Sequence, residues 1–506
     1  MCSAYFGEDG IEIDASRNEE IMVMDKLIDK YKKIPVQARA SLWFLLCSFL
    51  QRGISVITTP IFTRLLTTSE YGQYNVFNSW LGIVTVIVSL DLYAGVYTQG
   101  LVKFDTDKAH FSSSLQGLTL VLISAWTLIY TVSRGFWNNL LELTTVQMYA
   151  MLIMIWTSAA FRFWSAEKRV DYSYRSLVLV TLTVSLTKPI VGIIFVTHAT
   201  EKVTARILGI ALVELIGFTW MFFAQLVRGK QFYNKKYWLY ALNFNLPLIP
   251  HYLSQIVLNS SDRLMIKSMV GASEAGIYSL AYALSQIMLL FNQALLQTIE
   301  PWVYKKIKED RAYDISKVAY PAFAFIAAVN LALIAFAPEA VRIFAPAEYY
   351  EATWVIPPVA MSVFFGFSYS FFANFEFYFE KTKFVMTASI IGAGLNLFLN
   401  WIFIRIYGYY AAGYTTLFCY IVFAVGHYYF MTRICRAKMD GLRVYNTKLL
   451  IIISLLFITS GFVMMSTYNY PIIRYGIIFI SFIIAIIKRK QIFSLLKSFF
   501  VLRKKT

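Results

Sequence analysis

The sequence predicts an all-α protein that crosses a lipid bilayer about fourteen times, and three observations lead to this fold class. Of its 506 residues, 58% are hydrophobic and only 15% are charged, whereas about a quarter of the residues of a soluble domain are charged. The apolar residues form long uncharged blocks such as 115–133 and 318–337. About 20 helical residues cross a bilayer core, where backbone groups must be satisfied within the helix. The third observation is that the basic residues gather on one side of these blocks.

Fourteen helical spans are expected along the chain. They lie near 42–63, 76–98, 113–133, 143–161, 176–198, 207–227, 239–261, 275–299, 318–337, 353–375, 384–404, 409–430, 449–470 and 471–487. Arg474 interrupts the last of these spans. Pro247 and Pro250 predict a bend in the seventh, which could serve as a hinge for gating or only for packing.

The distribution of basic residues predicts the orientation of the chain. Thirty-five of the 46 Lys and Arg residues fall before the first span, in alternate loops or after the last span. Such a bias marks the cytoplasmic side, so both termini are expected in the cytoplasm. The net charge of +17 is then explained by topology rather than by nucleic-acid binding, for which the sequence contains no motif.

The first forty residues form a cytoplasmic segment in this interpretation. Residues 1–23 are polar and acidic without periodicity, which predicts disorder or a start codon placed too far upstream. A short basic amphipathic stretch begins at Met24 and is expected to lie at the membrane interface.

No cofactor, metal site or catalytic residue is expected. The four Cys and four His residues show no paired spacing, and no phosphate-binding, dinucleotide-binding or hydrolase motif is present.

A faint internal repeat divides the chain into halves. At an offset of 199, Arg64 matches Arg263 and Arg52 matches His251, and an E-x-G-x-Y motif occurs at 70–74 and at 274–278. Both copies start on the same side, so the repeats are parallel, an arrangement common in transporters. The expected organisation is an N-lobe of six helices (41–228), a linker (229–238), a C-lobe of six helices (239–432), a cytoplasmic loop (433–448) and two further helices with a basic tail (449–506).

Residues 42–80 resemble the start of the Wzx-type polysaccharide flippases, and the specific part is TPIFTRLLTTSEYGQY at 59–74. These belong to the multidrug/oligosaccharidyl-lipid/polysaccharide exporter superfamily. The resemblance implies a flippase, not an enzyme, in the bacterial cytoplasmic membrane. It would move undecaprenyl-diphosphate-linked oligosaccharide repeat units to the outer leaflet for capsule or O-antigen synthesis. It also implies a coupling proton or sodium ion, and a polysaccharide polymerase and chain-length proteins as partners.

Ionisable residues inside spans are costly and mark a path or a relay. Arg52, Lys188 and His251 are therefore candidates for a cationic cavity that binds the diphosphate. Asp91 and Glu214 are candidates for ion coupling. The alternative is that they neutralise Arg52 and Lys188 as structural pairs. Asp262 and four other ionisable residues near the ends of expected spans are expected to extend to the membrane interface. Asp262 and the four others are therefore weaker candidates for substrate binding than the residues inside spans. These four are Arg64, Arg263, Glu300 and Arg405.

Two other function classes stay open. A membrane polymerase or glycosyltransferase usually needs a large outer loop, and the longest one here, 338–352, is short. The same fold could also carry a peptidoglycan precursor or exchange drugs for cations, although basic groups within spans favour an anionic cargo. The aromatic run at 371–379 could stack on sugars but is expected to form an interfacial belt.

Overall fold

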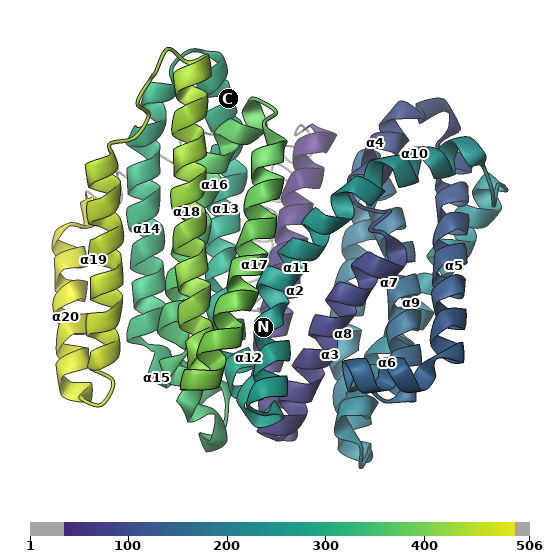
Figure 1. The fold of residues 1–506 in the computed structure, drawn as a ribbon, viewed down its shortest axis with the longest axis horizontal. Helices are drawn as coiled ribbons and strands as arrows, with labels where there is room; N and C mark the ends of the chain where they lie inside the picture. Colours follow the sequence, from purple (N-terminus) through teal and green to yellow (C-terminus); the bar gives the residue numbers. More distant parts are fainter. Residues whose placement is uncertain (1–34, 491–506) are drawn as a thin grey trace, which may run out of the picture.

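Residues 35–490 are the part of the chain that the computed structural model describes, and within them every regular element is a helix (Figure 1). The all-α fold class is confirmed. The expectations for 1–23, for the basic stretch from Met24 and for the tail after 490 lie outside the described residues.

The helices are α2 (Val36–Leu65), α3 (Thr68–Ser89), α4 (Val96–Lys103), η1 (Asp105–Asp107), α5 (Lys108–Val132), α6 (Arg134–Leu141), α7 (Thr145–Val170), α8 (Tyr174–His198), α9 (Lys202–Gly229), α10 (Lys235–Asn245), η2 (Leu246–Leu248), α11 (Ile249–Met269), α12 (Ala272–Gln286), α13 (Met288–Lys308), η3 (Ala312–Asp314), α14 (Ile315–Ala335), α15 (Ala337–Phe344), η4 (Ala347–Trp354), α16 (Ile356–Tyr378), α17 (Thr382–Tyr407), α18 (Tyr410–Lys438), α19 (Thr447–Ser466) and α20 (Pro471–Ile487).

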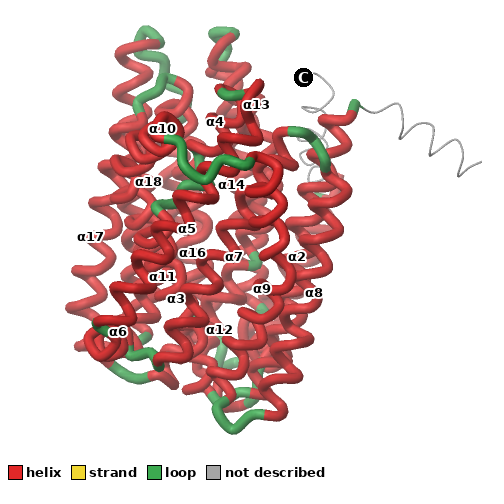
Figure 2. Tube along the Cα trace, turned by 90° about the vertical axis from the view of Figure 1, so that its right-hand side faces the viewer, coloured by secondary structure: helices red, strands yellow, loops and turns green. Residues whose placement is uncertain are grey.

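Eleven helical segments of the described chain are long and apolar enough to cross a membrane. Figure 2 shows the long helices running in one general direction, with the loops gathered at the two ends. The other three expected spans are α20, which is shorter, and the pairs α3–α4 and α10–α11, each of which is a broken helix. The expected bend of the seventh span is confirmed, because η2 contains Pro247 and interrupts it.

The break between α3 and α4 was not expected from the sequence. Leu90 and Asp91 adopt left-handed backbone angles (φ 51° and 47°), and Gly95 does so as well (φ 55°) before α4 begins. Such angles are costly for residues other than glycine. Asn245 at the end of α10 holds the break, because its side-chain amide donates to the carbonyls of Leu90 (2.9 Å) and Asp91 (2.7 Å).

The loops lie on two sides of the bundle, and the helix ends on one side are rich in basic residues, as the last turns of α7, α9 and α18 show. We call the side with loops 171–173, 230–234, 379–381 and 439–446 the basic side, which is up in Figure 1, and the other the opposite side. α7, α8 and α9 pack together in the first half, and α16, α17 and α18 in the second. α10 contacts α4 and α5, so the linker expected at 229–238 is followed by a helix that still packs against the first half.

The aromatic run at 371–379 differs from what the sequence predicts, and the charge of Arg474 within the last span has a structural explanation. The run at 371–379 does not form an interfacial belt, because Phe371, Phe372 and Phe375 are at most 4% exposed and belong to the core of the second half. Arg474, which interrupts the last span, is neutralised by an ion pair with Glu339 of α15. A paired charge of this kind is tolerated in a membrane helix.

The two copies of the E-x-G-x-Y motif contact each other on the opposite side. A Cβ atom on Gly72 of α3 would lie 1.9 Å from the carbonyl oxygen of Ala272, and one on Gly276 of α12 would lie 2.0 Å from that of Thr68. Only glycine allows helices to approach so closely. The hydroxyls of Thr68 and Ser273 are 2.7 Å apart at the same contact.

Further contacts between the halves lie on this side. Thr63 donates to the carbonyl of Phe344 (2.6 Å), and Arg64 donates to that of Ile343 (2.9 Å). Lys267 of α11 forms an ion pair with Glu142, which follows α6 (2.7 Å). The opposite side is therefore closed by contacts between the first and second halves.

Replacing Gly72 by alanine should loosen this closure, because the methyl group would overlap the Ala272 carbonyl at a cost of about 1–3 kcal/mol. With Thr68→Cys and Ser273→Cys in a chain lacking native cysteines, oxidative cross-linking should fall severalfold in Gly72→Ala. Gly394→Ala is the control, because nothing lies within 4 Å of its added Cβ. Undiminished cross-linking in Gly72→Ala would contradict the close glycine contact.

Candidate functional site

Lys188 and Glu214 form an ion pair inside the first half. The Nζ atom of Lys188 on α8 lies 2.6 Å from Oε1 of Glu214 on α9. Thr157 of α7 donates to the other carboxylate oxygen (3.4 Å), and the ring of Phe218 lies 5.7 Å from the ammonium group. The Glu214 side chain is 7% exposed but that of Lys188 is 30% exposed. Lys188 is thus paired and still accessible.

Arg52 lies one helix away on α2 and is half-buried. Its neighbour Gln51 donates to the hydroxyl of Ser185 (3.1 Å), one turn before Lys188 on α8. Among the described residues, Arg52 forms no ion pair with Asp91 or with any other carboxylate. The structure therefore brings Arg52 close to the Lys188 helix but leaves its guanidinium without an acidic partner.

Asp91 and His251 lie toward the basic side rather than beside the Lys188 pair. Asp91 occupies the break between α3 and α4, and His251 lies in the first turn of α11. The Nδ1 atom of His251 is buried without a hydrogen-bond partner, and its ring lies 5.9 Å from that of Tyr252. The sequence offered two ion pairs as the alternative to a cationic cavity. Of these, Lys188–Glu214 forms and Arg52–Asp91 does not.

The weaker candidates have different surroundings. Arg64 is exposed and donates to the Pro60 and Ile343 carbonyls. Arg263 stacks on Tyr282 at 4.2 Å. Arg405 is exposed and stacks on Trp401 at 4.5 Å, while Glu300 on α13 is half-buried.

Asp262 does not reach an interface and lies in a buried polar network of the second half. It is 1% exposed. Its carboxylate accepts hydrogen bonds from Tyr278 of α12 (2.6 Å), Asn400 of α17 (2.6 Å) and Thr416 of α18 (3.0 Å). Asn396 extends the network by bonding to Asn400 (3.2 Å). Four helices thus enclose a carboxylate among neutral oxygen and nitrogen groups, which is an environment suited to a monovalent cation or a proton.

A second buried acid, Glu376, pairs with His427. Nδ1 of His427 on α18 lies 2.8 Å from Oε1 of Glu376 on α16, and the two side chains are 1% and 0% exposed. The other atom of each group, Nε2 and Oε2, has no partner. This pair is not predictable from the sequence, because Glu376 lies within an aromatic run and His427 stands alone in its helix.

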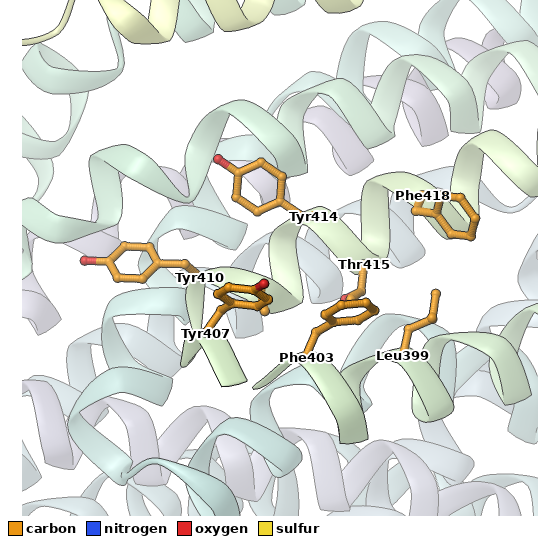
Figure 3. Close-up of a pocket in the computed structure, with 8 residues that line it drawn as sticks. Leu399, Phe403, Tyr407, Tyr410, Tyr414, Thr415 and Phe418 are labelled. Carbon is orange, nitrogen blue, oxygen red and sulfur yellow. The ribbon is translucent and has the colours of Figure 1, made fainter. Parts of the chain in front are cut away.

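An apolar pocket of about 580 Å³ lies between α17 and α18 (Figure 3). Its lining consists of Leu399, Phe403, Tyr407, Tyr410, Ala411, Tyr414, Thr415 and Phe418. Thr415 donates to the side-chain oxygen of Asn400 and so links the pocket wall to the Asp262 network. The described residues contain no group of three or more His, Cys, Asp or Glu side chains placed to hold a metal ion.

A protein-family model described as "Polysaccharide biosynthesis protein" matches residues 38–306, just over half of the chain. The chain belongs to this family. The curated "Lsg locus putative protein 1" of Haemophilus influenzae is 22% identical over 376 residues, which cover 69% of this chain and 87% of that protein.

Solved structures share the fold. The lipid II flippase MurJ in an inward closed conformation matches with a TM-score of 0.60 at 14% identity, covering 85% of this chain and 98% of MurJ. An inward-facing multidrug MATE transporter gives 0.59 at 11% identity (77% and 96%), and the Vibrio cholerae transporter VcmN gives 0.56 at 12% (81% and 98%). The resemblance seen at 59–74 agrees with the family to which the chain belongs. The chain is a multi-pass membrane protein that shares its fold with these transporters.

Proposed function

We propose that the protein moves an undecaprenyl-diphosphate-linked oligosaccharide across the bacterial cytoplasmic membrane by alternating access, without covalent chemistry. The observation that carries this proposal is that two cationic side chains, Arg52 and Lys188, are partly accessible inside a bundle closed on one side. Diphosphate is an anion that cannot cross hydrocarbon unaided, and Arg and Lys are its usual ligands. Membership in a polysaccharide biosynthesis family supports a saccharide cargo.

The basic side faces the cytoplasm in this proposal. The expected positive-inside bias supports this orientation. Reporter fusions in loop 230–234 should then report the cytoplasm, and fusions at 199–201 should report the exterior. The same reporter signal from both positions would contradict the alternation of α9 between the two sides.

Arg52→Ala should lower flipping of a lipid-linked oligosaccharide in proteoliposomes by roughly tenfold or more, because hydrogen bonds to a charged group contribute about 1.5–3 kcal/mol. Arg52→Lys should restore part of the activity, since the charge remains but the planar fork is lost. Arg134→Ala, which removes an exposed arginine of α6, is the control.

Lys188 needs a different variant, because removing it alone leaves Glu214 buried and unpaired at a cost of about 3–5 kcal/mol. In the double variant Lys188→Met, Glu214→Gln both charges are absent and folding should be retained. Transport should still fall at normal protein abundance if Lys188 binds the phosphates. Wild-type transport in the double variant would mean that the pair is structural.

Ion coupling is proposed at Asp262 rather than at Asp91 or Glu214. Glu214 is already neutralised by Lys188, and Asp91 lies at a helix break. Asp262 accepts hydrogen bonds only from neutral donors. Arg263 acts on it electrostatically but forms no ion pair with it within the described chain, so a bound proton or sodium ion is proposed to balance its charge.

Asp262→Asn should make transport insensitive to imposed ion gradients, because the amide keeps the shape of the carboxylate but binds neither a proton nor sodium. Transport in proteoliposomes would be measured under a pH gradient and, separately, a sodium gradient. Asp440→Asn, in an exposed loop, should respond as the wild type does. A gradient response in Asp262→Asn equal to that of the wild type would exclude this site.

A further inference from the structure

A second basic site lies where the break between α3 and α4 faces α7. A pocket of about 580 Å³ opens there on the basic side. Tyr93, Gly95 and Thr98 line it from the break and the start of α4, and Arg162, Ser165 and Arg169 line it from α7. The two arginines are seven residues apart, so they lie on one face of α7 about 10 Å from each other along the helix.

Neither arginine is neutralised by an ion pair within the described chain. Arg162 lies over the ring of Tyr93 at 4.7 Å, and Arg169 over that of Phe44 at 5.9 Å. The acidic residue of the same helix segment, Glu167, is buried and bound to Arg228 (2.6 Å). Stacking on a ring leaves the edge of a guanidinium free for bidentate bonds to phosphate.

The wall opposite the arginines offers further donors. α4 begins at Val96 directly after Gly95, and the first N–H groups of a helix lack intrahelical acceptors and carry its positive dipole end. Tyr93, a residue that is 8% exposed, adds a phenolic hydroxyl whose polar neighbours are Ser89 and Asp91. Asp91 is the carboxylate that acts electrostatically on Tyr93, so two arginines outnumber one acid at this site.

Two aromatic rings lie between the pocket and the paired charge inside the first half. Phe161 lines the pocket and stacks on Phe218 with 4.5 Å between ring centroids. The ring of Phe218 in turn lies 5.7 Å from the ammonium group of Lys188. Helices α10 and α11 also adjoin the pocket, because a Cβ atom on Gly95 would lie 3.5 Å from the ring of Phe244 and 3.5 Å from the hydroxyl of Tyr252.

We propose that this pocket, built by Tyr93, Thr98, Arg162, Ser165, Arg169 and the start of α4, captures the diphosphate of the lipid-linked cargo before translocation. The inference rests on the proposed function, and it separates a capture site at the mouth from the interior cations Arg52 and Lys188. The side chains of Arg162 and Arg169 are long and lie on one face of α7, so in this proposal they converge on different phosphoryl groups of one diphosphate. The rings beside them and the open side of the pocket leave room for the attached lipid and saccharide.

Binding of undecaprenyl diphosphate to the purified full-length protein in nanodiscs tests this proposal. Arg162→Ala and Arg169→Ala should each weaken binding roughly tenfold, and the double variant should weaken it further. Arg162→Lys should bind with intermediate affinity. Arg433→Ala, at an exposed position near the basic-side end of α18, should bind as the wild type does. Unchanged binding in the double arginine variant at an unchanged melting temperature would overturn the proposal.

Competition experiments identify the source of the phosphate. Inorganic pyrophosphate should compete with undecaprenyl diphosphate in the wild type but not in the double arginine variant, and undecaprenyl monophosphate should bind more weakly. Nanodiscs with and without phosphatidylglycerol distinguish a membrane lipid headgroup as the ligand. Displacement of the diphosphate by phosphatidylglycerol would overturn the assignment to cargo.

A flipping assay on the same variants separates this inference from the proposed function. Loss of binding and of flipping in the arginine variants, with both retained in Arg433→Ala, supports the capture site. Normal binding in those variants, with flipping intact in the wild type, removes the capture site and leaves the flippase assignment standing. A wild type that neither binds nor flips polyprenyl diphosphates would overturn both.

Discussion

The free energy needed to hold a charge in hydrocarbon governs where the ionisable side chains of this bundle lie. Glu214 neutralises Lys188, which is partly accessible, and Glu339 neutralises Arg474, which is buried. Arg206 has no carboxylate partner among residues 35–490 and lies between two rings, 3.6 Å from Phe62 and 3.5 Å from Tyr74. Arg52 lacks such compensation within the described chain, and Lys188 is paired but still 30% exposed, so these two cations are the ones on which the proposed mechanism depends.

The repeated motif connects the closed side of the bundle to these charges. Its glycines, Gly72 and Gly276, bring α3 and α12 together. Its tyrosines then reach opposite charges in the two halves, because Tyr74 stacks on Arg206 whereas Tyr278 donates to Asp262. Tyr278, which donates to Asp262, thus lies within one helical turn of Gly276, whose contact with α3 closes the opposite side. This proximity gives a direct physical route by which ion binding could alter the closure.

The sequence was sufficient for the features that depend on composition and period. Apolar length predicted the membrane helices, and Pro247 predicted the bend before α11. The break at Leu90–Gly95 could not be predicted, because it depends on Asn245, which lies about 150 residues further along the chain. The same limit applies to Asp262 and to the Glu376–His427 pair. The position of Asp262 near the end of an expected span indicated exposure, and nothing in the sequence related Glu376 to His427, whereas burial and pairing are decided by partners on other helices.

The closed side is held by contacts that can be exchanged for water at small cost. The carbonyls of Ile343 and Phe344 end α15, and such terminal carbonyls have no intrahelical donors. Each hydrogen bond to them contributes about 0.5–1.5 kcal/mol net of hydration. Moving a two-state equilibrium from 1:99 to 99:1 requires about 5.5 kcal/mol of differential binding. A few such hydrogen bonds and one glycine contact together stabilise the closed state by a free energy of that order. The stabilisation from the apolar cores within each half is far larger. Under the proposed function, cargo and ion binding would therefore be sufficient to open this side without unfolding either half.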